Sequence, residues 1–510
     1  MKLLSYLKRN SLLSISLGIL LVFSFFLYAE TLKTYIAIEE ASLWVRTYFG
    51  PFYLYLGLGC VLLLVGIALS KWGSYKIGNQ HKKPVFSRLA WISMLYSAGM
   101  GAGILLRAVQ EPVFMQQHPP LATSSGAETI ALEFTFYQWG FTAWAFYAVF
   151  ALAIGYAIFK RELPVATSST FARLLPKTKI TGEKSPIFFQ FIDILTILTT
   201  VFGLVAAVGL GASQIKGGLN HLFDVDFDYK IIIALVILIG FLSLLSALSG
   251  VDKGIKRLST WNIYLTIALL LFVFVQCDIP AVLKQFFISL YRYIIDFIPM
   301  SLAMGKYNPG QAFLTDWTYY YWAFWLAWAP FTGIFIARIS QGRTLREIII
   351  GVLLIPSLGT FFWFTVFGQS AFEMIANWGS YSGEFDNVFT SIFVFLEHYP
   401  AQGFINMIVI ILLVSFLVTS VDSAIYVLSM FTDRGNPDPS KKQRLLWSII
   451  LTVFSVGIVL LGHAKTDSDV LTAMQKLLII TSLPLSLLMV LMIILWIIDL
   501  SQKRNKHTIS

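Results

Sequence analysis

Charged residues are scarce in this sequence. They make up 13% of its 510 residues, whereas 57% are apolar and the mean hydropathy is +0.75. Soluble domains carry roughly 25% charged residues, and a chain of this length could not cover a water-facing surface with so few. The composition therefore excludes a soluble enzyme, a disordered protein and a nucleic-acid-binding protein, and it predicts an all-α integral membrane protein in contact with lipid.

Cysteine and histidine are also rare. The two cysteines, Cys60 and Cys277, lie in apolar runs, so we expect no disulfide framework or cysteine metal site. The six histidines fall in loops or at span ends, and the clearest acids within spans, Asp193 and Asp422, have no histidine beside them. The sequence also lacks a glycine-rich phosphate-binding loop followed by Lys and Ser or Thr. We therefore expect no enzyme activity, no bound cofactor and no ATP-driven transport.

Long apolar runs are abundant instead. A helix needs about 20 residues to cross ~30 Å of hydrocarbon. Windows of this length predict twelve spans, at residues 11–29, 50–70, 88–108, 134–159, 187–215, 231–249, 257–277, 317–340, 347–370, 403–430, 445–462 and 476–499. Most basic residues fall in the two tails and in the loops after even-numbered spans. By the positive-inside rule, both termini are predicted to be cytoplasmic, in the cell (inner) membrane.

Two spans contain residues that weaken a helix. The third has glycines at positions 99, 101 and 103, and the eighth has Pro330 and Gly333. Interrupted helices at matching positions in two halves point to an inverted-repeat transporter. Close packing through small residues would explain either segment alone. We expect both helices to be interrupted and spans 3–7 and 8–12 to form two inverted five-helix repeats.

These features divide the chain into five segments. Residues 1–87 hold two peripheral spans, 88–280 the first repeat, 281–312 an amphipathic interfacial helix and connection, 313–500 the second repeat, and 501–510 a short cytoplasmic tail. The interfacial helix mixes aromatic and aliphatic positions with a few charges. It is either a packing surface between subunits or a plain interfacial helix without a partner.

Aromatic residues gather inside spans four and eight. Trp144 and Tyr147 are three residues apart in span four, where Trp139 precedes them, and Trp325 and Trp328 are three apart in span eight. Residues with this spacing share a helix face. Facing indole rings suit a quaternary ammonium, because cation–π attraction stabilises a charge that has no N–H donors. The alternative is an interfacial belt combined with core packing, the usual role of membrane Trp and Tyr.

Hydroxyl groups lie near the end of span ten. Thr419 and Ser420, beside an unwound third span, could ligate a small hard cation such as sodium. Ser and Thr inside membrane helices more often bond their own backbone. Asp422 follows them, and a salt bridge near the cytoplasmic end is its simplest role.

Several stretches of the sequence, taken together, resemble those of a known protein family. They are residues 99–103 with Glu111 and Pro112, Trp139-Gly140 with Trp144 and Tyr147, residues 249–256, residues 322–347 and residues 419–423. With these stretches the chain resembles the betaine/choline/carnitine transporter family from about residue 50 to residue 500, and residues 322–347 look like the family's signature. The resemblance implies a twelve-helix secondary transporter, often a homotrimer. Its substrates are glycine betaine, choline or carnitine, moved by sodium or proton symport or by exchange.

The resemblance also implies functional residues. Its substrate cage would consist of Trp139, Trp144, Tyr147 and Trp325, with Phe324 and Trp328 as flanking gate or transient-site aromatics and Met100 beside the substrate. Its sodium site would use Ser97, Ala98 and Met100 with Phe416, Thr419 and Ser420.

The sequence departs from the family pattern at three places. Phe324 stands where a third tryptophan is typical, and residues 202–208 are apolar where sodium-coupled members have threonines, so we expect no second sodium. Arg107 stands where an aromatic residue is usual. It could bind a substrate carboxylate or replace an ion as a tethered cation. The alternative is that it points outward and pairs with Glu111 one turn on.

Two other functions fit the same fold. The first is transport of another amine or an amino acid, although the aromatic segments offer few acceptor groups for a primary ammonium. The second is a solute sensor that binds without transporting. Uptake and competition measurements would separate these from a quaternary-ammonium transporter.

Overall fold

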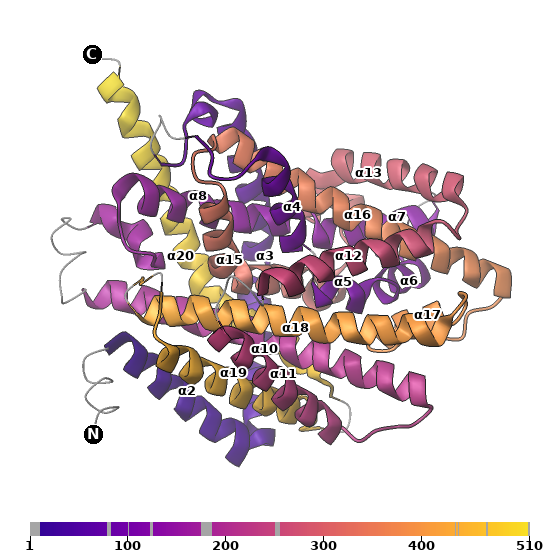
Figure 1. The fold of residues 1–510 in the computed structure, drawn as a ribbon. Helices are drawn as coiled ribbons and strands as arrows, with labels where there is room; N and C mark the ends of the chain where they lie inside the picture. Colours follow the sequence, from indigo (N-terminus) through magenta and orange to yellow (C-terminus); the bar gives the residue numbers. More distant parts are fainter. Residues whose placement is uncertain are drawn as a thin grey trace.

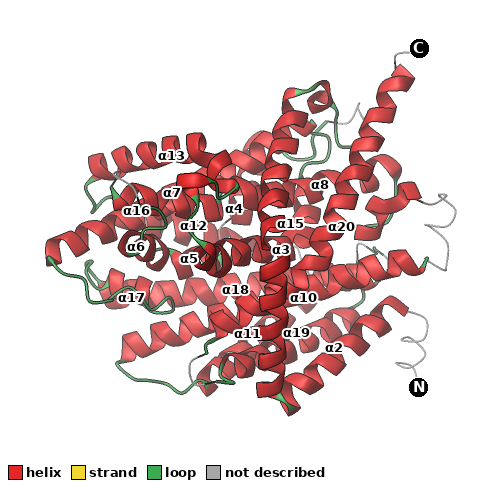
Figure 2. Ribbon diagram, turned by 180° about the vertical axis from the view of Figure 1, so that it is seen from behind, coloured by secondary structure: helices red, strands yellow, loops and turns green. Residues whose placement is uncertain are grey.

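The structure, a computed structural model, describes residues 11–78, 83–99, 101–122, 126–174, 186–249, 255–433, 435–436, 438–465 and 468–507. In these ranges the chain forms helices and connections, with no strand beyond an isolated bridge between Lys76 and Thr344 (Figure 2). The expected all-α fold is confirmed. The helices are α2 (Ser11–Ala29), α3 (Thr31–Leu69), α4 (Arg88–Gly99), α5 (Ala102–Arg107), α6 (Gln110–Gln117), α7 (Ala127–Trp139), α8 (Phe141–Arg161), α10 (Ile187–Phe223), α11 (Lys230–Ser249), α12 (Ile255–Phe274), α13 (Ile279–Ser301), α14 (Gln311–Phe313), α15 (Tyr319–Ile339), α16 (Leu345–Trp378), α17 (Ser391–Leu396), α18 (Gln402–Thr432), α19 (Lys441–Gly462) and α20 (Val470–His507).

Every predicted span overlaps helical structure. Ten of the described helical stretches are long and apolar enough to cross a membrane, or up to eleven if the bent pair of α12 and α13 is one span. The third predicted span falls outside that number because it is split into α4 and α5, each too short to cross alone. Figure 1 shows the long helices side by side, with the beginning of α2 and the end of α20 toward the same end of the bundle.

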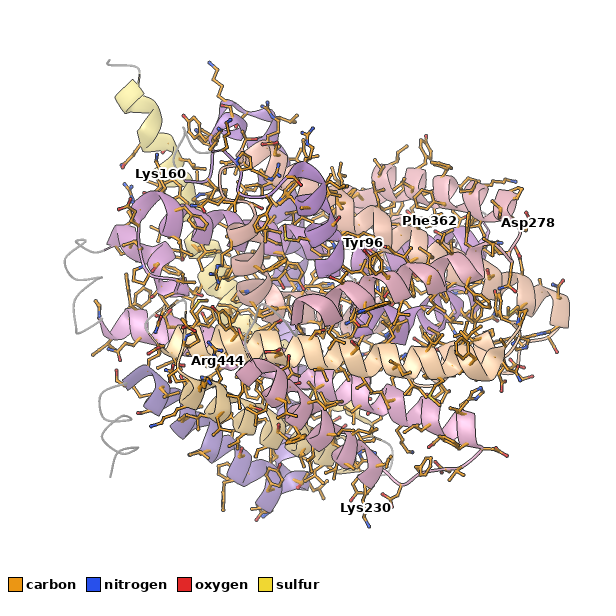
Figure 3. The ribbon with its side chains drawn as sticks, in the orientation of Figure 1. Tyr96, Lys160, Lys230, Asp278, Phe362 and Arg444 are labelled. Carbon is orange, nitrogen blue, oxygen red and sulfur yellow. The ribbon has the colours of Figure 1, made fainter. Side chains whose placement is uncertain are left out.

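Charged side chains lie at both ends of this bundle. Lys160 and Arg444 lie toward the end of the bundle where α2 begins and α20 ends, and Asp278 lies at the opposite end (Figure 3). Near the first of these ends, Arg161 in the last turn of α8 donates to Asp499 of α20 at 2.7 Å. These charged residues thus mark the two ends of the bundle.

The interruption expected in the third span is present. α4 ends at Gly99, Gly101 is extended with φ −152° and ψ −177°, and α5 begins at Ala102. A broken helix frees backbone groups that lipid cannot satisfy, so protein groups have to bond them. At the other end of the short α5, the indole N–H of Trp363 on α16 donates to the carbonyl of Ile104 at 3.2 Å.

The interruption expected in the eighth span is absent, and that prediction was wrong. α15 runs unbroken from Tyr319 to Ile339 with Pro330 inside it. Proline is tolerated in a membrane helix that packs against neighbouring helices. Gly333 serves this packing, because a Cβ on it would lie 2.6 Å from the Cβ of Phe150 on α8. The segment with Pro330 and Gly333 is therefore explained by the alternative, close helix packing through small residues. The inverted repeat stays a prediction.

A second interruption lies in the fourth span, where the sequence predicted a continuous helix. α7 ends at Trp139 and α8 begins at Phe141, with Gly140 between them. A Cβ on Gly140 would lie 2.5 Å from the carbonyl oxygen of Phe136, so a side chain does not fit there. The freed N–H of Phe141 donates to the hydroxyl of Tyr293 on α13 at 3.0 Å. A tyrosine from another helix thus completes the hydrogen bonding of the break.

The second helix starts earlier than the sequence predicted. α3 begins at Thr31 rather than near residue 50, and its first half includes Glu39, which hydropathy windows penalise. Glu39 accepts hydrogen bonds from Lys476 at 2.6 Å and from Lys465 at 3.0 Å. Two ammonium groups therefore compensate the carboxylate, and the helix continues through it.

α13 leaves the direction of the other helices. It bends from α12 by 112° and packs against α7 and α16 at the edge of the bundle (Figure 1). Near the C-terminal end of α13, Asp296 accepts a hydrogen bond from the hydroxyl of Tyr307 at 2.7 Å. This hydrogen bond raises the pKa of Tyr307 to about 12, so the phenol remains a donor at physiological pH.

Candidate functional site

A cavity of about 500 Å³ lies between the interrupted third span and the helices around it. Sites for small molecules are typically ~300–1,000 Å³. Its lining comes from α5, α7, α8, α10, α12, α15, α16 and α18. Six aromatic residues of the predicted site form one wall: Trp139, Trp144, Tyr147, Phe324, Trp325 and Trp328.

Four of these rings, which we call the cage, form a continuous row. Trp139 meets Trp325 with ring centroids 5.2 Å apart, Trp325 meets Tyr147 at 6.2 Å, and Tyr147 meets Trp144 at 5.3 Å. The interplanar angles are 71°, 86° and 89°, so each contact is edge-to-face. This is a favourable arrangement for aromatic pairs. Residues from α7, α8 and α15 that are far apart in sequence therefore build one surface.

Hydrogen bonds fix two of the cage rings. The indole N–H of Trp325 donates to the backbone carbonyl of Gln138 at 2.9 Å. In an unbroken helix that carbonyl would accept from Thr142, so the break at Gly140 leaves it available. The indole N–H of Trp139 donates to both carboxylate oxygens of Glu111, at 3.2 and 3.3 Å. Both indole N–H groups are thus bonded to protein.

Glu111 is the centre of a buried polar group behind the cage. Its side chain is 0% exposed, and it accepts a hydrogen bond from the hydroxyl of Tyr321 as well as those from Trp139. The Nε of Arg107 lies 3.9 Å from its Oε2. Two donor groups, which make three hydrogen bonds, and one cation therefore surround a carboxylate that would be costly to bury alone.

Arg107 lies outside the cavity lining. Its Nη1 donates to Gln110 at 2.6 Å, and its guanidinium stacks over the ring of Trp317 at 5.0 Å. The residue is 5% exposed. The structure thus brings Arg107 to Glu111, as one of the two sequence readings expected, but buries it instead of turning it outward. It does not bring Arg107 to the cavity.

The residues expected on span ten face the cavity from α18. Phe416, Thr419 and Ser420 all line it. The hydroxyl of Thr419 donates to the carbonyls of Ser415 and Phe416, both at 3.0 Å, which is the backbone bonding usual for a helical threonine. It also receives a hydrogen bond from the Asn262 amide at 3.5 Å.

The remaining expected residues belong to α4 and the break. Ser97 and Ala98 lie in the last turn of α4, where the structure describes the backbone but not the side chains. Met100 lies outside the described residues. Asp422, expected in a salt bridge, instead accepts a hydrogen bond from Ser246 on α11.

The cavity reaches the surface near the end of α15. Phe335 and Arg338 line it and are exposed, and Ser423 and Tyr426 of α18 line the same region. A Cβ on Gly155 would lie 3.4 Å from the Cβ of Ala337, so α8 and α15 end side by side. The opening is therefore at the end of the bundle that holds Lys160 and the end of α20.

Sequence reasoning missed several residues of the site. Glu111 was noted only as part of a motif, and the roles of Gln138, Asn262 and Gln214 were not seen. A usable signal exists for Asn262 and Gln214, because each is an amide side chain inside an apolar run, whereas Gln138 acts through its backbone carbonyl. Polar side chains within membrane helices usually face the protein interior or a cavity.

A membrane protein of helices around an aromatic-walled cavity beside a broken helix belongs to the class of small-solute carriers. Residues 11–505 match the sequence profile of the betaine/carnitine/choline family transporters, and the chain belongs to this family. It is thus an integral membrane transporter, as the sequence resemblance implied.

Relatives cover nearly the whole chain. The sequence is 37% identical to "Glycine betaine transporter OpuD" of Bacillus subtilis, over 92% of this chain and 90% of the relative. It is 32% identical to "Probable glycine betaine transporter" of Desulfitobacterium hafniense, over 95% and 96%. It is 34% identical to "High-affinity choline transport protein" of Escherichia coli, over 87% of this chain and 65% of that protein.

Proposed function

We propose that the protein is a secondary transporter that moves a small quaternary-ammonium solute of the glycine betaine, choline or carnitine type across the cell membrane. Family membership and the names of the relatives support this substrate class. The observation that carries it is the row of edge-to-face contacts from Trp139 through Trp325 and Tyr147 to Trp144 along one wall of the cavity.

The cage suits a methylated nitrogen in particular. A quaternary ammonium donates no hydrogen bond, so it needs a surface of negative electrostatic potential rather than acceptor atoms. Aromatic ring faces supply that potential. Because the N–H groups of Trp139 and Trp325 are already bonded to Glu111 and to the backbone of Gln138, the two rings are held in place without the ligand. Phe324 and Trp328 extend the aromatic wall toward the opening at Arg338, as a path for the solute.

We propose sodium as the coupling ion, bound where α18 faces the break between α4 and α5. The support is that Phe416, Thr419 and Ser420 line the cavity, and that hydroxyl and carbonyl oxygens are ligands suited to a hard cation. In this proposal Ser97, Ala98 and Met100 complete the site from the third span.

We propose that the structure corresponds to an inward-open state, with both termini in the cytoplasm. The opening lies beside Arg338, at the end of the bundle where basic residues concentrate, which supports a cytoplasmic assignment by the positive-inside rule. On the opposite side of the cage, Arg107, Glu111 and Tyr321 form a buried layer. Alternating access would open that side while the Arg338 side closes.

Uptake into proteoliposomes tests the proposal. Labelled glycine betaine, choline and carnitine are each supplied without a gradient, with a sodium gradient and with a proton gradient. We expect saturable uptake of at least one solute, driven by one gradient or by exchange, and recovery of the solute chemically unchanged, as for a carrier rather than an enzyme. Absence of both uptake and competition by all three solutes would refute the substrate class.

Two controls separate the alternatives. Binding without uptake, measured by tryptophan fluorescence, would indicate a sensor. Stronger competition by primary amines or amino acids than by quaternary compounds would indicate the other transporter function. The variant Trp325→Ala should abolish tight binding in either assay if the cage is the site.

We also propose a homotrimer assembled through α13. This helix exposes large apolar side chains along its length, at Phe287, Tyr291, Ile294, Ile295 and Ile298. Apolar exposure of this kind faces lipid or another subunit. Native mass spectrometry of the detergent-solubilised protein would distinguish a trimer from a monomer, and Phe287→Ala with Tyr291→Ala should weaken the trimer.

A further inference from the structure

The cavity contains a polar side chain that neither the cage nor the proposed sodium site uses. Gln214 on α10 lines the cavity and is 0% exposed. Neither its Oε1 nor its Nε2 has a hydrogen-bond partner among the described residues. Buried amides in native proteins are almost always bonded, so we expect this one to have a partner beyond the described residues.

Close packing holds Gln214 where it is. A Cβ on Gly211, one turn earlier, would lie 2.6 Å from Leu417 of α18. A Cβ on Gly218, one turn later, would lie 2.3 Å from Phe393 of α17. With α10 fixed against both neighbours, the helix cannot rotate to bring the amide to another protein group. The space that remains for a partner is the cavity.

The interrupted third span leaves room between Gln214 and the cage. A Cβ on Gly103 would lie 3.2 Å from Trp139, so this glycine faces the cage. A Cβ on Gly101 would meet no atom within 4 Å, so the space beside it is open. α5 also packs against α10, and both line the same cavity. A small molecule whose ammonium lies in the cage can therefore extend past the glycines toward α10.

Building on the proposed function, we propose that Gln214 binds the polar end of the substrate, a carboxylate or hydroxyl group, through its side-chain amide. The Nε2 group donates two hydrogen bonds, which suit a carboxylate, and Oε1 can accept from a hydroxyl. The cage recognises the methylated nitrogen that all these solutes share. Gln214 recognises the oxygen-bearing end, and it makes the site prefer such solutes over a bare tetraalkylammonium.

Uptake and competition by two variants test this role. Gln214→Leu removes both polar atoms at similar volume, and Gln214→Met does so with an unbranched chain in case leucine does not fit. We expect either to raise the KM of the transported solute by about tenfold to a hundredfold, the range for a hydrogen bond to a charged group. The inhibition constant of tetramethylammonium, which has no polar end, should change less than about twofold.

Gln443→Leu is the matched control. Gln443 on α19 is 1% exposed and also has no partner for either amide atom among the described residues, but it does not line the cavity. Its replacement should leave both constants unchanged. Because Gln214→Leu and Gln443→Leu each remove an unpaired buried amide, neither should lower the melting temperature.

Three results would overturn the role of Gln214. The first is an unchanged KM in both Gln214 variants. The second is parallel weakening of tetramethylammonium and the transported solute, which would mean that the amide only shapes the cavity. The third is an altered sodium dependence with an unchanged substrate KM, which would assign the amide to the ion. Failure of the proposed function itself would look different, since the unmodified protein would then neither take up nor bind the solutes.

Discussion

Removing Arg107 should destabilise the protein unless Glu111 is neutralised at the same time. Arg107→Gln leaves the Glu111 carboxylate at 0% exposure with only the neutral donors of Trp139 and Tyr321. Arg107→Gln combined with Glu111→Gln removes both charges and leaves neither buried alone. The double variant should therefore be more stable than the single one.

The distance between the two groups sets the size of the effect. Arg107 Nε and Glu111 Oε2 are 3.9 Å apart and both side chains are buried. At an effective dielectric constant of about 20, two unit charges roughly 4 Å apart attract by ~4 kcal/mol. Removing one partner of a buried pair is destabilising by about 3–5 kcal/mol, whereas replacing the whole pair is often nearly neutral. We expect the single variant to lose this amount and the double variant to recover most of it.

Thermal unfolding in detergent can be followed through Cys60. This thiol is 1% exposed, so a thiol-reactive dye labels it only on unfolding, and a Cys277→Ser background removes the second thiol. The single variant should melt lower than the parent by on the order of 5 °C, with the double variant in between. Equal melting temperatures for all three proteins would refute the electrostatic reasoning. If stability is unchanged and Arg107→Gln weakens only carboxylated solutes, Arg107 contacts the substrate instead.

Three further predictions concern the cage, the helix break and the ion. Trp325→Ala should weaken binding of a quaternary ammonium by roughly 30-fold or more, from a desolvated cation–π contact of about 2 kcal/mol, measured by competition. Tyr293→Phe should lower stability by about 1–3 kcal/mol in thermal unfolding, since it leaves the N–H of Phe141 buried without an acceptor; unchanged stability would mean that the break needs no partner. Ser420→Ala should raise the sodium concentration for half-maximal uptake with little change in uptake at saturating sodium, and an identical sodium curve would remove this hydroxyl from the ion site.

Much of the architecture follows from local patterns. Apolar length alone predicts the helices, because a membrane span must be both long and apolar. The i, i+3 spacing of Trp144 and Tyr147 predicts that both rings face the same side, and both line the cavity. The break at residues 99–103 was also predictable, since three alternating glycines weaken any helix.

Other features depend on contacts between helices that no local pattern contains. Pro330 looks like a helix breaker, but the helix continues because α15 packs tightly on α8 at Gly333. Gly140 lies in a run that looks helical, and its break exists because Tyr293 from α13 supplies the missing acceptor. The unpaired amide of Gln214 likewise becomes visible only when its surroundings are known.

The hydrogen bond from Trp325 to Gln138 ends on a main-chain atom. A replacement at position 138 changes the side chain and leaves this acceptor in place, so ordinary mutation cannot delete the anchor of the central ring. Variants with a different solute preference can therefore be sought by randomising positions 144 and 147, because Trp325 keeps its position. The other rings of the cage can then be changed while Trp325 keeps its hydrogen bond to the backbone.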